Sequence, residues 1–242
     1  MLDSLSPFLR GLALHEEDAA ALARAFGPVR ALEKGEQLLR EGDRPGALSI
    51  LCEGVAQASR TVPTGGQQTL ALFVPGDMLD APAFVLGPTR VAVCAVTLIR
   101  IVQIAHALLE PLIAARPAIG RAIWTAMAGD GALLQEWMVG LGRRNAYAQL
   151  AHLMCELSAR MQAAGMAAGE SCRFPLTQSE LADVLGLSTV HVNRILQQLR
   201  GDGLIELARG WLTIRNPERL VAVSGFDPSY LGSRGQTFEE AL

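Results

Sequence analysis

The spacing of hydrophobic residues changes near residue 104, and the change separates two kinds of predicted structure. Between residues 31 and 102, apolar runs such as ALSILCEGVAQASR and QQTLALFV lie between glycines, which is typical of short strands joined by turns. The stretch PTGGQ between these runs predicts a hairpin tip. The N-terminal part is therefore predicted to form a compact antiparallel β-roll or barrel, preceded by a helix over residues 16–26.

After residue 104, apolar residues recur at intervals close to three and four, as on one face of a helix. This stripe consists of Ile113, Gly120, Ile123, Met127, Leu134, Trp137, Met138 and Leu141. It predicts a helix of about 25 residues that begins near Pro117, because proline suits a first helical turn; Gly129 and Gly131 weaken it. The stripe is either a core face packed on the β-roll or, as we favour, a dimerisation helix that pairs with its copy.

A second amphipathic pattern, NAYAQLAHLMCELSARM, predicts another helix, and the following AAGMAAGESCRF predicts a loop or linker. We expect three parts: a β-roll effector domain over 1–110, a dimerisation helix and hinge over 111–145, and a winged helix-turn-helix domain over 146–242. The fold class is α+β. The tail SGFDPSYLGSRGQTFEEAL is polar and rich in glycine after Asp227, so we expect its end to be flexible and assign it no function.

The stretch LTQSELADVLGLSTVHVNRILQQLRGDGLIE contains two helical patterns separated by one glycine. Thr177 and Glu180 have the spacing of a capping box, Gly186 occupies a turn that needs a left-handed residue, and Ser188 is placed to cap the second helix. The residues predicted to be buried in that helix are Val192, Ile195, Leu196 and Leu199. This is the pattern of a helix-turn-helix, and GLIELARGWLTI after it predicts a β-hairpin wing.

The outward residues of the second helix suit the DNA major groove, although an ordinary helical hairpin is the plainer alternative. Arginine can bond guanine O6 and N7, threonine and histidine can reach bases or phosphates, and valine can touch a thymine methyl. We predict DNA contacts from Thr177, Ser188, Thr189, Val190, His191, Arg194, Gln197 and Arg209.

The net charge of the chain argues against strong DNA binding, because binding to phosphates depends on lysine and arginine. The chain has a net charge of -3 with 21 basic and 24 acidic residues, and residues 143–242 are neutral rather than basic. A specific binder can still use a local basic stripe, here Arg143, Arg144, Arg194, Arg200, Arg209 and Arg215. We therefore expect weak non-specific attraction to DNA.

The order of these parts resembles the Crp/Fnr family of bacterial transcription regulators over nearly the whole chain. The resemblance rests on the helix-turn-helix stretch and, less specifically, on KGEQLLREGD, LSILCEGVAQ and FVPGDML. It implies a homodimer that reads an inverted repeat in double-stranded DNA, with RNA polymerase as a candidate partner. The family's base-reading Arg, Glu and Arg correspond to Thr189, Val190 and Arg194, and His191 stands in place of the family's Thr or Ser. Only Arg194 is retained, so the family's usual half-site is not assumed.

The same resemblance argues against cyclic AMP as the effector. Cyclic-nucleotide-binding members carry a Gly-Glu pair and an Arg-Ser pair, whereas this chain reads GDMLDAPAFVLGPTRVAV. Asp80 and Ala81 replace Gly and Glu, and Thr89 and Arg90 stand near the Arg-Ser place. We predict an effector pocket that contains Leu72, Asp80, Val85, Thr89 and Arg90. Both a small effector other than cyclic AMP and a roll without a ligand stay open.

Cysteine and histidine positions predict no metal and no cofactor. The cysteines at 52, 94, 155 and 172 have no clustered spacing, and the absence of a cysteine before Cys52 argues against the family's iron-sulfur sensor. Haem-sensing relatives take axial ligands from the roll and the dimer helix, which makes Cys94 and His106 candidates, but we favour structural roles for both. The sequence lacks phosphate-loop, GxSxG and HExxH motifs, which argues against an enzyme.

Two functions remain after these exclusions. We favour a homodimeric regulator that binds specific DNA sequences. The alternative is a ligand-binding signalling module whose winged domain contacts proteins. Because residues 1–18 lack a basic start and a long apolar run, and no apolar stretch is long enough to span a membrane, we expect a cytoplasmic protein.

Overall fold

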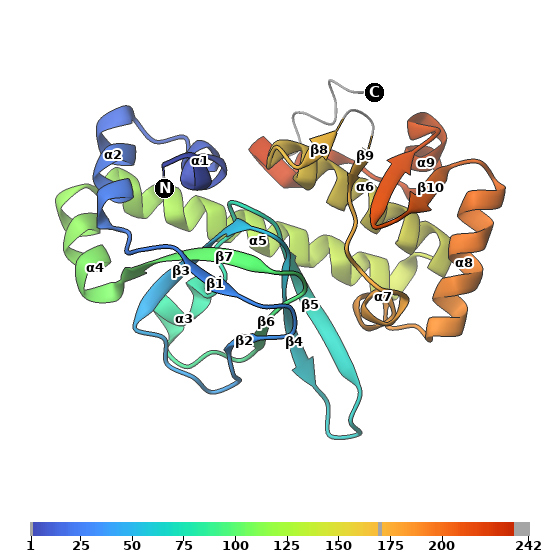
Figure 1. Cartoon of the computed structure of the whole chain (residues 1–242), viewed down its shortest axis with the longest axis horizontal. Helices are drawn as coiled ribbons and strands as arrows, with labels where there is room; N and C mark the ends of the chain where they lie inside the picture. The colour runs from blue at the N-terminus through green and yellow to red at the C-terminus, as the bar shows by residue number, and fades with distance from the viewer. Residues whose placement is uncertain (1, 169–170, 235–242) are drawn as a thin grey trace. The chain divides into compact units, whose positions relative to one another are not determined.

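The computed structural model describes residues 2–168 and 171–234 (Figure 1). The chain forms two compact units, Met1–Asp130 and Gly131–Leu242, and the boundary between them falls inside one helix.

The N-terminal unit is built around antiparallel strands. Its elements are α1 (Leu2–Gly11), α2 (Glu16–Ala25), β1 (Arg30–Leu32), β2 (Gln37–Leu39), β3 (Ala47–Glu53), β4 (Ala56–Thr61), β5 (Gln67–Phe73), α3 (Ala81–Leu86), β6 (Ala92–Ala95), β7 (Ile99–Ala105) and α4 (His106–Ala115). One sheet has the order β1-β7-β3 and the other β2-β6-β4-β5, with antiparallel pairs throughout. The predicted β-roll, the helix over 16–26 and the β4–β5 hairpin are confirmed.

Alternation along the strands fills the interior of the roll. Ala56 and Ala58 of β4 pair with Phe73 and Ala71 of β5, and all four pack in the apolar cluster between the sheets. Leu72 lies between the last two, so its side chain points to the opposite face of the sheet. The turn from β3 to β4 requires glycine at Gly54, where φ is +85° and any Cβ would overlap the carbonyl oxygen of Leu98.

The long helix α5 (Pro117–Arg143) has 27 residues and is continuous through Gly129 and Gly131, as predicted. Its first turns pack Ile119 and Ile123 against a cluster formed by α1, β3 and β7. None of the helices in the described part of the chain is both long and apolar enough to cross a membrane.

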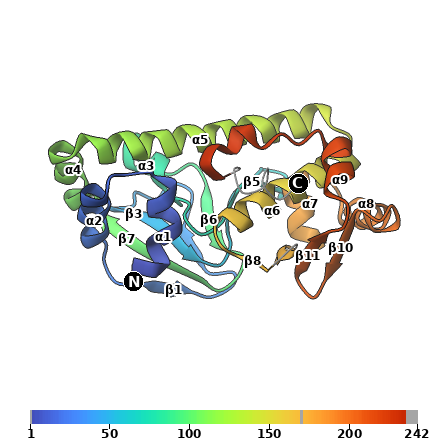
Figure 2. The same cartoon turned by 90° about the horizontal axis from the view of Figure 1, so that it is seen from above.

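The C-terminal unit combines a helix-turn-helix with a small sheet. After the end of α5 come α6 (Ala146–Ala163), β8 (Ala167–Ala168), β9 (Ser171–Arg173), α7 (Gln178–Leu185), α8 (Thr189–Gly201), β10 (Ile205–Ala208), β11 (Trp211–Ile214), α9 (Pro217–Ser224) and a 3-10 helix over Pro228–Arg234. The sheet order is β10-β11-β9-β8. Figure 2 shows the β10–β11 hairpin beside α8, which confirms the winged helix-turn-helix.

The predicted linker AAGMAAGESCRF was wrong in part, because it contains β8 and β9. Cys172 of β9 is buried and pairs with Leu212 of the wing, so this segment belongs to the sheet. The predicted flexible end of the tail, residues 235–242, lies outside the described residues, as do residues 169–170.

Candidate DNA-binding surface

The first helix of the motif begins with the predicted capping box. Glu180 N–H donates to the Thr177 hydroxyl oxygen at 3.2 Å, and Thr177 N–H donates to a Glu180 carboxylate oxygen at 2.6 Å. The helix ends at Gly186, whose φ of 64° and ψ of 33° are left-handed. The angle between α7 and α8 is therefore set by local residue chemistry.

The second helix, α8, begins at its own cap, where His191 N–H donates to the Ser188 hydroxyl oxygen at 3.3 Å. Its buried face consists of the four predicted residues, Val192, Ile195, Leu196 and Leu199. Anchoring this face against the unit leaves the opposite face of the N-terminal half of α8 turned outward.

The outward face of α8 carries most of the residues predicted to contact DNA. Thr189, Arg194 and Gln197 are exposed, His191 is half-buried, and Val190 is 80% exposed. Asn193, which sequence reasoning passed over, donates to Gln178 at 3.0 Å and joins α8 to the first turn of α7.

The wing contributes a second group of cations. Arg209 and Gly210 form its turn with φ values of 52° and 76°. Beside the turn, Arg173 of β9 pairs with Trp211 of β11, and its guanidinium lies 4.7 Å from the centre of the indole ring. Arg173 was absent from the predicted set because its segment was assigned to a linker, and only its pairing with the wing reveals its place.

Other arginines of the predicted basic stripe are engaged within the protein. Arg215 pairs with Glu206, Arg200 donates to the carbonyl oxygen of Leu207 at 3.1 Å, and Arg144 pairs with Glu136 at 3.4 Å. Arg194, Arg209 and Arg173 are instead exposed cations of the α8 face and the wing. The electrostatic potential that a phosphate would meet there depends mainly on these three side chains.

In the predicted effector region, Asp80 is buried and hydrogen-bonded within the protein. Its carboxylate accepts hydrogen bonds from Ser49 N–H at 2.7 Å and from the Ser49 hydroxyl at 2.8 Å. Gln103 in turn donates to the same hydroxyl oxygen at 3.0 Å. Burial raises the pKa of Asp80 to about 6, although the bonds from Ser49 lower it.

The other residues assigned to this pocket have different environments. Thr89 is buried. Its backbone N–H donates to the carbonyl oxygen of Asp43 at 2.8 Å, and its carbonyl oxygen accepts from Gly42 N–H at 2.9 Å. Arg90 is exposed, as is Val85 at 56%. Leu72 is buried, but its side chain lies on the face of β5 opposite to that of Ala71 and Phe73. The ring of His106 packs on Phe84 with centroids 4.7 Å apart, which fits the structural role expected for it.

The four cysteines are free thiols. Burial raises the pKa of Cys155 to about 12 and that of Cys52 and Cys172 to about 11, and it also raises the pKa of Cys94. Within residues 2–168 and 171–234, no group of three or more His, Cys, Asp or Glu side chains is placed to hold a metal ion.

Comparison with known proteins finds two family models in this chain. The Crp-like helix-turn-helix domain matches residues 148–223, and the cyclic nucleotide-binding domain matches residues 29–116. The transcriptional activator protein anr of Pseudomonas aeruginosa is 25% identical over 222 residues, covering 92% of this chain and 91% of that protein. The fumarate and nitrate reduction regulatory protein of Salmonella typhimurium is 22% identical, covering 92% and 88%.

Solved structures share the fold. FixK2 from Bradyrhizobium japonicum matches with a TM-score of 0.73 and 23% identity, covering 81% of this chain and 96% of that one. The c-di-GMP responsive global regulator CLP of Xanthomonas campestris matches with a TM-score of 0.67 and 17% identity, covering 84% and 100%.

Proposed function

Because the chain belongs to the Crp/Fnr family of DNA-binding transcription regulators, which are not enzymes, we propose that it reads an inverted repeat as a homodimer. The observation that carries this proposal is the outward face of α8, where Thr189, Val190 and Arg194 stand exposed above a buried apolar anchor. Two such helices related by a two-fold axis would enter successive major grooves about 34 Å apart.

The chemistry of this face suits base edges better than phosphates. Arg194 offers two parallel N–H donors to guanine, Val190 offers an apolar surface to a thymine methyl, and the Thr189 hydroxyl can donate or accept. Phosphate contacts are assigned to Arg209 on the wing and to backbone groups at the start of α7 beside Thr177. Sequence preference and affinity thus come from different parts of the unit.

The dimer proposal rests on α5. Exposed or half-buried residues recur along it at heptad positions, namely Trp124, Met127, Gly131, Leu134, Met138 and Leu141. Trp124 and Met138 are 61% and 68% exposed, a large apolar area for one helix to leave in water. We propose that this seam pairs with the same seam of a second copy. We also propose that residues 1–110 form the effector domain, 111–145 the dimerisation helix and hinge, and 146–242 the DNA-binding domain.

The stripe predicted from sequence proves to combine two faces of α5. Ile123 and Trp137 are buried within their own chain, whereas Leu134, Met138 and Leu141 are exposed. Packing on the N-terminal unit applies to Ile123, Trp137 is buried against Glu156 of α6, and the proposed dimer seam uses the other three.

We further propose that any small effector is not cyclic AMP. The Asp80 carboxylate occupies the start of α3 and is bound to Ser49, so an anion placed there would meet an acidic group already engaged by the protein. The related protein CLP is described as responsive to c-di-GMP, so this fold serves ligands other than cyclic AMP in at least one protein.

The proposal is tested by selecting bound duplexes from a random pool at physiological salt. We expect enrichment of an inverted repeat, and loss of this enrichment in Arg194→Ala with the fold intact. Arg219→Ala is the matched control, because it removes the same charge from α9, where Arg219 reaches the carbonyl oxygen of Asp202 at 3.5 Å. Equal binding by Arg194→Ala and wild type would contradict the assignment of α8. Binding of a small ligand without any sequence preference, even at low salt, would favour the signalling module instead.

A further inference from the structure

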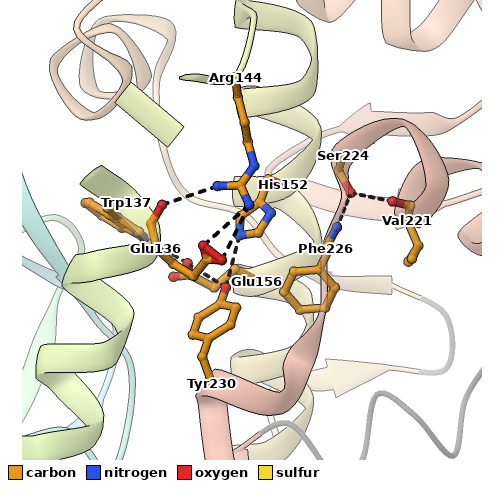
Figure 3. Close-up of polar contacts among 9 residues, drawn as sticks. All are labelled: Glu136, Trp137, Arg144, His152, Glu156, Val221, Ser224, Phe226 and Tyr230. Atoms are coloured by element: carbon orange, nitrogen blue, oxygen red, sulfur yellow. Dashed lines mark hydrogen bonds and ion pairs between the residues drawn. The ribbon is translucent and has the colours of Figure 1, made fainter. Parts of the chain in front are cut away.

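The segment from Phe226 to Leu231, here called the C-terminal latch, follows α9 and lies beyond the residues matched by the family model, which end at 223. Phe226 and Leu231 are buried, and Tyr230 is half-buried. Figure 3 shows Phe226 and Tyr230 beside His152 and Glu156 of α6. A polar, glycine-containing tail therefore begins with residues that are packed into the C-terminal unit.

Glu156 is the centre of the contacts that the latch makes. Its side chain is 0% exposed, and its carboxylate accepts three hydrogen bonds. The donors are Trp137 Nε1 of α5 at 2.8 Å, Arg160 Nη1 of α6 at 3.0 Å and the Tyr230 hydroxyl of the latch at 3.2 Å. One buried carboxylate thus joins the long helix, α6 and the C-terminal segment.

His152 of α6 extends this network. Its Nε2 lies 3.2 Å from the Tyr230 hydroxyl. The Tyr230 hydroxyl thus lies between His152 and Glu156 and connects the two side chains. The imidazole also packs between two rings of the latch, at 5.2 Å from Phe226 and 6.0 Å from Tyr230.

A buried carboxylate is tolerated only when its charge is paired and its acceptor positions are filled. Glu156 therefore favours the arrangement that keeps Trp137, Arg160 and Tyr230 all in place, and loss of one donor weakens the hold on the others. Only Arg144 and Asn145 separate α5 from α6, and Arg144 turns back to donate to the carbonyl oxygen of Glu136 at 3.2 Å. Rotation between these helices would break the bond from Trp137 to Glu156.

We propose that the C-terminal latch is a positioning element for DNA recognition: through Tyr230 and Glu156 it fixes the helix-turn-helix relative to the C-terminal part of α5. This inference rests on the proposed dimer, because α5 is the element through which two reading heads would be held at one separation. Tyr230 and Trp137 would then determine which half-site spacing the dimer prefers, and would not determine which bases it contacts.

The test uses the full chain and the inverted repeat selected by the wild type. Binding is measured on that duplex, on duplexes whose half-sites are moved apart or together by one and two base pairs, and on a single half-site. In Tyr230→Phe we expect the preference for the selected spacing to fall roughly tenfold, as loss of a hydrogen bond to a charged group predicts. Affinity for the single half-site should stay within about twofold.

Tyr147→Phe is the matched control, because the chain has two tyrosines and the Tyr147 hydroxyl also bonds a carboxylate, that of Asp202, at 2.6 Å. It should leave the spacing preference unchanged. Trp137→Phe removes the donor from α5 and should act as Tyr230→Phe does, whereas a general loss of stability would lower binding to all duplexes equally. Wild-type spacing preference in both Tyr230→Phe and Trp137→Phe would overturn the latch.

Hydrogen exchange separates failure of the latch from failure of the proposed function, because it needs no DNA. Amides in residues 134–143 of α5 should exchange faster in Tyr230→Phe than in wild type and Tyr147→Phe. If the wild type selects no inverted repeat and this change is still seen, the dimeric reading of DNA fails while the hold of the latch on α5 stands. Unchanged exchange overturns the latch, whatever the DNA result.

Discussion

The two units each bury a carboxylate, and they satisfy it by different means. In the N-terminal unit Asp80 receives both of its side-chain hydrogen bonds from one neutral residue, Ser49. In the C-terminal unit Glu156 receives bonds from three elements, one of them from the guanidinium of Arg160. Asp80 thus ties α3 to a single strand, whereas Glu156 holds together segments that are far apart in the sequence.

This difference predicts unequal responses to loss of charge. Asp80 has no cation among its bonded partners, so a neutral group of the same shape can replace it at little cost. Glu156 forms a buried ion pair with Arg160 and also accepts hydrogen bonds from Trp137 and Tyr230, so its removal breaks all of these contacts at once. Three experiments test the buried groups of the two units and a fourth tests the wing, in order of decreasing effect.

Glu156→Ala should give the largest loss, a decrease of about 3 to 5 kcal/mol in the free energy of unfolding, because it breaks a buried ion pair and removes the acceptor of the buried Trp137 and Tyr230 donors. Urea unfolding measures this value. Glu206→Ala breaks the exposed pair with Arg215 and should cost less than about 1 kcal/mol. Equal losses in the two variants would contradict the central role of Glu156.

Acid should destabilise the C-terminal unit through His152. Burial and the nearby Arg144 lower the pKa of His152 from 6.5 to about 4. The unfolded chain therefore takes up the proton first as pH falls below 6.5, and stability is lost until about pH 4. Between pH 7 and 5 we expect a loss of about 2 kcal/mol relative to His152→Phe, measured by urea unfolding at each pH. Parallel pH profiles for the two proteins would contradict this prediction.

Asp80 should act in the opposite direction. Its pKa is raised from 3.8 to about 6, so the folded state takes up the proton first and the penalty for a buried charge disappears as pH falls through 6 toward 3.8. Relative to Asp80→Asn, the wild type should gain about 1 kcal/mol of unfolding free energy between pH 7 and 5. A gain in the opposite sense would mean that Asp80 is stabilised as a carboxylate.

The smallest effect concerns the wing and distinguishes exposed cations from paired ones. If Arg173 on Trp211 contacts one phosphate, Arg173→Ala should lower the slope of log affinity against log salt by about 0.9 and weaken all DNA sequences alike. Arg215→Ala is the control, because Arg215 is paired with Glu206. An unchanged salt slope in Arg173→Ala would remove Arg173 from the interface.

The helix-turn-helix could be predicted from sequence because its signals are local. Thr177 and Glu180 are three residues apart, and Gly186 and Ser188 act on the backbone next to them. Each of these signals therefore involves residues only a few positions apart in the sequence. The β-roll could be predicted for a similar reason, from alternating runs between glycines.

The missed features depend on contacts between distant residues. Trp137 and Tyr230 lie 19 and 74 positions from Glu156, and no periodicity relates them. Strands of two and three residues, such as β8 and β9, are too short to show alternation, so their segment was taken for a linker. The sequence shows that Asp80 and Ala81 replace the family's Gly-Glu pair. It does not show that Asp80 bonds to Ser49, because Ser49 lies 31 positions away.

At Arg209, in the turn of the wing, the residue that would best stabilise the fold differs from the residue that would best bind DNA. Arg209 adopts a left-handed backbone that costs an arginine about 1 kcal/mol and glycine almost nothing. Arg209→Gly should therefore raise the melting temperature while removing a cation from the proposed interface. An engineer who selects this protein for heat resistance would tend to recover glycine there, whereas selection for a tighter repressor or activator would keep the strained arginine.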